Sequence, residues 1–200
     1  MNILFGHYIA DSGSIEVFGR TIQQGSPHAA IELGIGMVHQ HFTLADNLSV
    51  LDNVMLGTEP LWWFSSNRRA GRLKLEQLGE RFGLRVKPNA RVAELSIGER
   101  QRVEILKALY RNAQILILYE PTAVLTPQET DTFFETLKKL VSGGLSLIFI
   151  SHKMQEVLAI SDRVAVLNEG RLVSELKTAD ASEIELAQSM IGRDIELPER

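Results

Sequence analysis

The stretch that decides the fold is Leu95-Ser96-Ile97-Gly98-Glu99-Arg100-Gln101-Arg102. Ser96 and Glu99 have the spacing of a capping box, and the pattern beyond them predicts a helix to about Arg111. The first amides of such a helix carry partial positive charge and attract anions, phosphate among them. Taken alone, the pattern more often marks an ordinary capped helix, so the surrounding sequence has to decide.

Two apolar runs on the C-terminal side each end in a polar side chain. Ile115 to Leu118 leads to Tyr119 and Glu120, and a second run, Leu147 to Ile150, leads to His152. Continuous apolar runs are typical of strands covered on both faces, and ligands bind at the carboxyl edge of a parallel sheet. There Glu120 is placed to polarise water for attack on a γ-phosphate. Singly, each is better explained as a solvated glutamate or a structural histidine.

The composition excludes several classes of protein. The 200 residues are 44% hydrophobic and 23% charged, with a net charge of −4 and no cysteine. This balance supports a folded core and gives no basic surface for nucleic acid. Disulfides and thiolate metal sites are excluded, and no apolar stretch reaches the roughly 18 residues that span a bilayer.

The remaining pattern predicts an α/β domain with a helical insertion in its first half. Helices are expected at 1–5, 127–141 and 154–161, with a helix-rich region at 48–83. Strands are expected at 14–18, 34–39, 114–119 and 145–150, and a hairpin at 163–175.

Four of these stretches, in this order, resemble the ATP-binding domains of ABC transporters. Leu95 to Arg102 resembles the signature motif, and Gln114 to Thr126 resembles the Walker B strand with the D-loop that follows it. His152 corresponds to the switch histidine and Gln40 to the Q-loop glutamine. The resemblance covers essentially the whole chain, and motifs that are weak singly become specific as a set.

The resemblance implies a P-loop NTPase-like fold, an α/β domain with a mostly parallel sheet, a helical subdomain and a small antiparallel β portion. The first strand and the Walker A loop are expected to be missing. Residues 1–200 would form a single, partial ABC ATPase domain, with the helical subdomain inserted at about 43–110 and the start of a linker to a second domain at 188–200.

The resemblance also implies ATP and Mg²⁺ as ligands, bound between two such domains arranged head-to-tail. Ser96 and Gly98 would contact the γ-phosphate of a nucleotide held by the partner domain, and Gln101 belongs to the same cofactor-binding set. Glu120 would be the general base, and His152 would steady the γ-phosphate and the attacking water. Gln40 would reach Mg²⁺ or water and report the nucleotide state to a membrane subunit.

The sequence departs from the family in two places. No Gly-x-x-x-x-Gly-Lys-[Ser/Thr] loop occurs, and Met1 to Gly6 resembles the helix that follows such a loop. Tyr119 stands where the family has the Walker B aspartate, and a phenol cannot replace a carboxylate that helps to hold Mg²⁺. We therefore expect an impaired metal site, weak ATP binding and slow or no hydrolysis by this chain alone. A natural truncation, a misplaced start codon, a pseudogene and an inactive partner half all remain open.

The subclass resembled is that of sugar and nucleoside importers with two tandem ATPase domains, to which Met190 to Asp194 and Glu120 to Glu129 also point. The implied function couples ATP hydrolysis to uptake of a small solute, with a lean towards nucleosides. The implied partners are a second ABC ATPase domain, transmembrane permease subunits and, indirectly, a periplasmic or lipoprotein solute-binding protein. The expected location is the cytoplasmic face of the membrane, with no membrane span and no nucleic-acid partner. Residues 43–93 would dock on the permease, with Trp62 and Trp63 near the contact or packed inside the helical subdomain.

Two other interpretations compete with this one. The chain could be a degenerate, non-hydrolysing half that lends only its signature helix to an intact partner, as Tyr119 and the absent loop favour. A soluble ABC ATPase of DNA repair or translation fits less well, since no sustained heptads occur.

Overall fold

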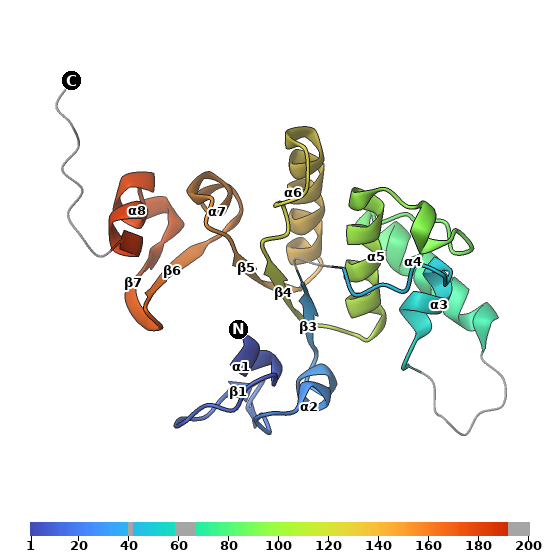
Figure 1. Ribbon diagram of the computed structural model, residues 1–200, viewed down its shortest axis with the longest axis horizontal. Coiled ribbons are helices and arrows are strands. Elements are labelled where there is room, and N and C mark those ends of the chain that lie inside the picture. The colour runs from blue at the N-terminus through green and yellow to red at the C-terminus, as the bar shows by residue number, and fades with distance from the viewer. Residues whose placement is uncertain (40–41, 59–66, 192–200) are drawn as a thin grey trace. The chain divides into compact units, whose positions relative to one another are not determined.

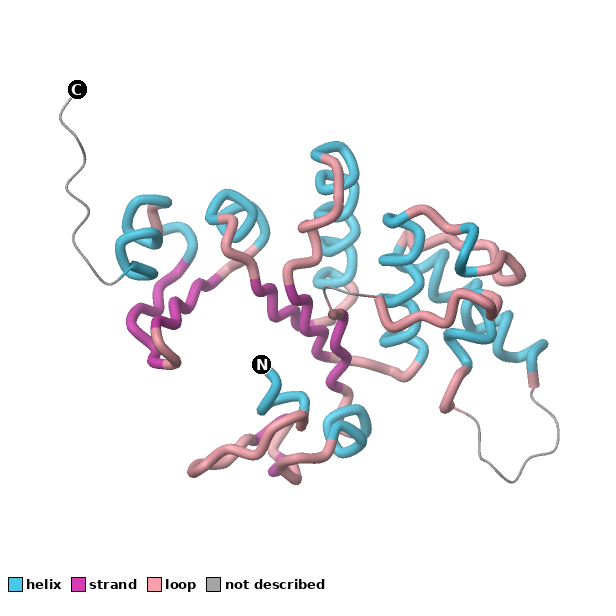
Figure 2. The backbone as a smooth tube through the Cα atoms, in the orientation of Figure 1, coloured by secondary structure: helices cyan, strands magenta, loops and turns pink. Residues whose placement is uncertain are grey.

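The computed structural model describes residues 1–39, 42–58 and 67–191, and it divides into two compact units, Met1–Ile150 and Ser151–Arg200. The first unit is built on a parallel three-stranded sheet with the order β3-β4-β5 (Figures 1 and 2). Its strands are β3 (Ile35–Val38), β4 (Ile115–Tyr119) and β5 (Ser146–Ile150). Strands at 34–39, 114–119 and 145–150 were predicted, and the parallel sheet is confirmed.

The register of this sheet brings the ends of β4 and β5 together. Leu118 pairs with Phe149, and Tyr119 with Ile150, while Val38 at the end of β3 pairs with Leu118. The central strand is the most buried, because Leu116, Ile117 and Leu118 have no exposed surface. Burial on both faces explains the continuous apolar run of this strand.

Some helices of the first unit pack against the sheet, and others form a helical group beside it. That group contains α3 (Val50–Met55), α4 (Arg68–Phe82) and α5 (Ile97–Tyr110), which pack on one another at one side of the sheet in Figure 1. The short helix η1 (Val92–Glu94) leads into α5. The other helices are α1 (Asn2–Phe5), α2 (Pro27–Glu32) and α6 (Pro127–Ser142).

The helix starts that the sequence indicated are present. Ser96 and Thr126 cap α5 and α6, each in a complete capping box with the glutamate three residues on. The side of α5 that faces β3 packs closely, since a Cβ atom on Gly36 would lie 2.8 Å from that of Ala108. Only glycine at this position of β3 allows so close an approach of helix and sheet.

Two local expectations needed correction. The strand expected at 14–18 is only β1 (Glu16–Val17), paired antiparallel with β2 (Arg20–Thr21). It ends early because Phe18, with a φ of 51°, and Gly19, with a φ of 74°, both adopt left-handed conformations and turn the chain. Helix α2 was not expected, although Ser26 as N-cap and Pro27 at the first helical position are the signals for it.

The second unit contains the predicted hairpin, with helices before and after it in the sequence. Strands β6 (Arg163–Asn168) and β7 (Arg171–Lys177) pair antiparallel around a turn at Glu169 and Gly170. Helices α7 (Met154–Ile160), η2 (Thr178–Asp180) and α8 (Glu183–Ile191) complete it. Its small core joins Val164 and Val166 of the hairpin to Leu186 of α8.

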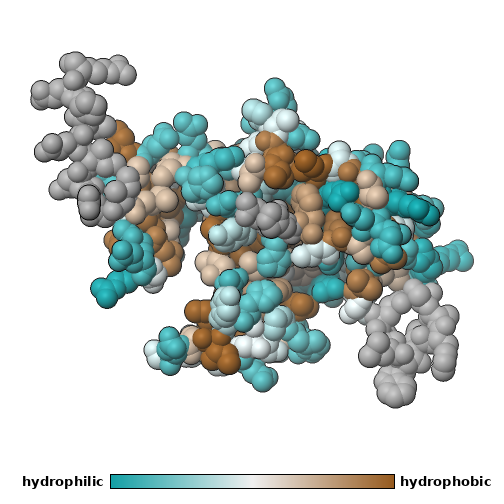
Figure 3. Space-filling view, in the orientation of Figure 1, coloured by the Kyte–Doolittle hydropathy of each residue, from teal (hydrophilic) through white to brown (hydrophobic). Residues whose placement is uncertain are grey.

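Large hydrophobic side chains also reach the surface, and Figure 3 shows hydrophobic residues at several separate places on the face in view. Three of the exposed ones lie near the ends of α5, β4 and the turn before α6: Ile97, Tyr119 and Val124. Among the helices of the described ranges, none has both the length and the apolar character needed to cross a bilayer. The prediction of one domain over 1–200 with a helical subdomain at about 43–110 stays a prediction.

Candidate nucleotide site at the start of helix α5

The start of α5 is held by a reciprocal pair of hydrogen bonds. The amide of Glu99 donates to the Ser96 hydroxyl oxygen at 3.3 Å, and the amide of Ser96 donates to the Glu99 carboxylate at 2.9 Å. Capping uses the Ser96 hydroxyl as an acceptor, so the chemistry of this group still allows its O–H to donate to an anion. Ser96 is exposed, and the outward dipole of α5 adds to its attraction for anions.

The charge on Glu99 maintains this cap at neutral pH. The backbone amide of Ser96 is the main cause that lowers the pKa of Glu99, helped by the Ser96 hydroxyl and the nearby Arg102 and Lys87 cations, and opposed by partial burial. A carboxylate that accepts hydrogen bonds from amides is stabilised in its ionised form. At physiological pH the ionised Glu99 therefore keeps its hydrogen bond to the backbone amide of Ser96.

The start of α6 lies beside that of α5. A Cβ atom on Gly98 would lie 3.4 Å from the Glu129 carboxylate, which caps α6 through Thr126. The backbone amide of Thr126 is the main cause that lowers the pKa of Glu129, and Arg102 contributes. Arg102 thus acts on the capping carboxylates of both helices, and the two helix starts form one polar surface.

Glu120 lies directly after β4, in a strained turn. Its φ of 44° is left-handed, a conformation that non-glycine residues adopt at some cost. Its amide donates to the carbonyl of Ile150 at 2.8 Å, and its carbonyl accepts from the amide of Ala123 at 3.2 Å. The carboxyl edge of the sheet therefore holds the backbone of the predicted general base, and the role of its side chain stays a prediction.

Gln101 faces inward, away from the surface of the helix start. Only 3% of its surface is exposed, and its side-chain amide donates to the carbonyl of Pro121 at 2.8 Å. Sequence reasoning placed Gln101 with the cofactor-binding residues, and that role stays a prediction. What the structure shows is a direct link between α5 and the turn that carries Glu120.

The other two predicted site residues, His152 and Gln40, are not part of the first unit's described site. His152 lies two residues beyond β5, is exposed, and belongs to the unit that begins at Ser151. Gln40 lies outside the described residues, as do Trp62 and Trp63. Ser96, Gly98 and Gln101 therefore lie in the first turns of α5, and Gln101 is hydrogen-bonded to the turn that holds Glu120.

The end of β4 does not fit a Mg²⁺ ion well. Among the described residues, no group of three or more His, Cys, Asp or Glu side chains is placed to hold a metal. Glu120 offers a carboxylate there, but its neighbour Tyr119, with 40% of its surface exposed, offers a phenol. Mg²⁺ prefers carboxylate and phosphate oxygens in a near-octahedral arrangement, so Tyr119 weakens this donor set.

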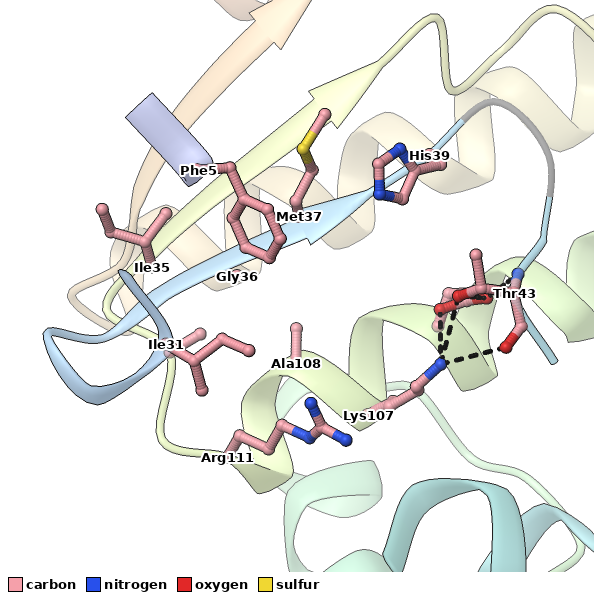
Figure 4. A pocket seen from close by; sticks show the side chains of 12 residues that line it. Phe5, Ile31, Ile35, Gly36, Met37, His39, Thr43, Lys107, Ala108 and Arg111 are labelled. Atoms are coloured by element: carbon pink, nitrogen blue, oxygen red, sulfur yellow. Dashed lines mark hydrogen bonds and ion pairs between the residues drawn. The ribbon is translucent and has the colours of Figure 1, made fainter. Parts of the chain in front are cut away.

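A pocket of about 220 Å³ opens between α1, β3 and the second half of α5 (Figure 4). Its apolar wall includes Phe5 and Met37, and its polar end holds Thr43, Glu104 and Lys107, which bond to one another. Sequence reasoning singled out neither Glu104 nor Lys107. Their polar positions within a mostly buried helix were the available signal, since buried charges are rare unless paired.

His39 lines the same pocket. Burial lowers the pKa of His39, the His7 ring and Lys107 lower it further, and Glu104 opposes them. The two histidine rings lie 5.9 Å apart. His39 is therefore biased towards its neutral form in the segment that leads to Gln40.

Comparisons with known proteins identify relatives of this chain. A glucose import ATP-binding protein of Haloferax volcanii, TsgD13, is 42% identical over 223 residues, which cover 98% of this chain and 40% of that protein. A guanosine import ATP-binding protein of Bacillus subtilis, NupO, is 44% identical over 195 residues, or 98% of this chain and 38% of that protein. The chain thus spans about two fifths of the length of the curated relatives it matches.

The fold matches as well. MJ1267, an ATP-binding cassette of an ABC transporter, superposes with a TM-score of 0.81 at 22% identity, covering 96% of this chain and 80% of that one. At that identity the likeness concerns the fold alone. The ABC transporter family model matches residues 1–123, a range that includes the capped start of α5, β4 and Glu120. With that match over more than half its length, this chain belongs to the ABC transporter family.

Proposed function

We propose that this chain is the ATP-binding, energy-coupling part of an importer for a small solute, a sugar or a nucleoside. Its relatives are named as glucose, nucleoside, guanosine and ribose import ATP-binding proteins. The proposed reaction is ATP hydrolysis coupled to uptake, at the cytoplasmic face of a membrane. Of these two solute classes, the sequence resemblance favours nucleosides.

The observation that carries the proposal is the pairing of an anion-binding helix start with a carboxylate turn. Ser96 and Gly98 stand at the exposed start of α5, and Gln101 of the same helix bonds to the residue after Glu120. Phosphate recognition and water activation are the two tasks that nucleotide hydrolysis requires. Helix α5 begins at the proposed phosphate-binding residues and is hydrogen-bonded through Gln101 to the turn that carries the proposed base.

The individual roles follow from this placement. Ser96 would donate its O–H to the γ-phosphate of a nucleotide held by a partner domain, and Gly98 would let that phosphate approach the helix backbone. Glu120 would act as general base. Gln40 and His152 keep the roles that the family resemblance gives them.

The proposed partners are a second ATP-binding domain and a membrane-embedded permease. Residues 43–93, which include α3 and α4, are the expected docking side. These two helices pack on each other and on α5, and α5 in turn packs on β3. A solute-binding protein would act through the permease and would not touch this chain.

The test is ATP turnover and solute uptake by the full-length protein assembled with its permease in vesicles. Gly98→Ala is the informative variant, since a methyl group there meets only the Glu129 carboxylate at 3.4 Å and the fold tolerates it. We expect turnover and uptake to fall together by about 10-fold or more, because the phosphate can no longer approach the helix. The matched control is Ile105→Val, a buried change in the same helix away from its start. Unchanged turnover in Gly98→Ala would contradict the proposal.

A further inference from the structure

We propose that Gln101 is a positioning residue that couples the start of α5 to the Glu120 turn, so that a nucleotide at Ser96 and Gly98 adjusts the general base of this same chain. The inference rests on the proposed function and deepens it. It assigns Gln101 a task different from direct contact with a cofactor.

The contact itself has the properties of a structural link. Gln101 is 3% exposed, and its amide donates to the Pro121 carbonyl over 2.8 Å within the buried interior. A buried amide that loses its acceptor costs more than an exposed one, so the contact persists while the helix is in place. It joins residues that are 20 positions apart in the sequence.

The turn that receives this bond is held from two sides. On the side of β5, the Glu120 amide donates to Ile150 at 2.8 Å, and on the side of α5, Gln101 holds the next residue, Pro121. Between these two bonds the backbone of Glu120 keeps its left-handed φ of 44°. A strained conformation persists only when surrounding contacts over-determine it, and the Gln101 bond is one of those contacts.

Helix α5 is the connection between the two ends of this link. Gln101 lies five residues after Ser96, which corresponds to about 7–8 Å along a helix axis. The helix between them is capped at Ser96. Beyond Gln101, the side chains of Val103, Glu104 and Ile105 are buried. A shift of the α5 start on phosphate binding would therefore move Gln101, and with it the carbonyl of Pro121.

Two substitutions of equal side-chain length separate the hydrogen bond from packing. Gln101→Met removes the donor and keeps the volume. Gln101→Glu removes the donor while the new carboxylate is ionised and restores an O–H donor when it is protonated. Burial raises the pKa of such a carboxyl, so protonation is reached at mildly acidic pH. The control Ile105→Val lowers packing in the same helix without touching the turn.

The first measurement is amide hydrogen exchange of the full-length protein, resolved for the peptide that covers residues 119–126. We expect the Glu120 and Ala123 amides to exchange about 10-fold faster in Gln101→Met, with other segments unchanged. Ile105→Val should leave this peptide as in the parent protein. Exchange that is unchanged at 119–126, or raised equally throughout the chain by Gln101→Met, overturns the inference.

The second measurement is ATP turnover by the full-length protein with its permease, across pH. Gln101→Met should lower kcat by about 10- to 100-fold and leave KM within twofold, since misplacement affects the base and not the binding groups. Gln101→Glu should recover towards the parent rate, relative to the parent at the same pH, as the pH is lowered. A rise in KM with kcat preserved, or no pH-dependent recovery, overturns the inference.

The two measurements distinguish a failure of the proposed function from a failure of the coupling role of Gln101. If the parent protein shows no ATP turnover, the proposed function fails, while faster exchange at 119–126 still establishes the link. If the parent turns over ATP and both Gln101 variants match it, the proposed function stands and the coupling role is wrong.

Discussion

The carboxylate of Glu104 accepts two hydrogen bonds from Thr43, one from its amide at 2.5 Å and one from its hydroxyl at 3.0 Å. These residues lie 61 positions apart, on α5 and on the segment after β3. Lys107 completes the cluster, with its ammonium 3.6 Å from Glu104 and 3.2 Å from the Thr43 carbonyl (Figure 4). Helix α5 therefore binds the segment on the C-terminal side of Gln40 as well as the Glu120 turn.

Glu104→Ala should destabilise the protein by about 3 kcal/mol, because it leaves the Thr43 amide and the Lys107 cation without their shared acceptor. The free energy of unfolding in urea measures this. Glu135→Ala is the matched control, as Glu135 pairs with Lys138 on the surface, where an ion pair contributes under about 1 kcal/mol. Equal losses of unfolding free energy in the two variants would show that the contacts of Glu104 stabilise the protein no more than a surface ion pair does.

Gly36→Ala should cost about 1–3 kcal/mol in unfolding free energy, because its new methyl group would lie 2.8 Å from the Ala108 Cβ and 3.1 Å from that of Ala113. Thermal or urea unfolding measures the loss. Gly98→Ala is the contrasting variant, because alanine in the first turn of a helix is tolerated and adds helix propensity. A Gly36→Ala protein as stable as its parent would mean that α5 and β3 separate more easily than their packing indicates.

The stability of the protein should depend on pH through His39. Its pKa in the folded protein lies below its usual value of 6.5, mainly because of burial, so the unfolded chain binds the proton more readily. This contribution to stability is complete above about pH 6.5 and is lost as the pH falls through the folded pKa. His39→Gln should therefore flatten the decline in unfolding free energy between about pH 7 and pH 5.

The direct check on His39 is its ring-proton NMR titration in the folded protein, with free histidine as the reference. A His39 midpoint at or above that of a free histidine would contradict the expected direction. In that case the slope of stability against pH would have to come from other groups.

Tyr119→Asp should strengthen Mg²⁺-dependent ATP binding and raise turnover in the full-length protein by about 10-fold or more, because a carboxylate replaces a phenol beside Glu120. ATP binding with and without Mg²⁺ measures the first effect. Tyr119→Asn controls for side-chain size, as it removes the ring without adding charge. If Asp and Asn behave alike, the metal-site interpretation of Tyr119 is wrong.

The sequence predicted well wherever a local physical signal was strong. Ser96 and Thr126 identified the starts of α5 and α6, because a capping box acts within four residues. The apolar run of β4 identified the central strand. The weak element was β1, where only two residues pair before the chain turns at Phe18.

The inward orientation of Gln101 was missed although a signal existed. Gln101 has the spacing of the buried residues Ile105 and Ala108 on α5, so helical periodicity places it on the core side. Its acceptor, the Pro121 carbonyl, belongs to a later segment and leaves no local trace. The Glu104–Thr43 contact is hidden for the same reason, since tertiary partners 61 positions apart do not appear in any short pattern.

The spacing of the contacts along α5 limits how this part of the chain can change length. Gln101, Glu104 and Lys107 follow one another at intervals of three residues. Gln101 bonds to Pro121, whereas Glu104 and Lys107 both bond to Thr43. One inserted residue would rotate everything beyond it by about 100° and shift it by about 1.5 Å. Insertions and deletions between 101 and 107 are therefore excluded, whereas the turn at Gly170, with open space around it, can accept them.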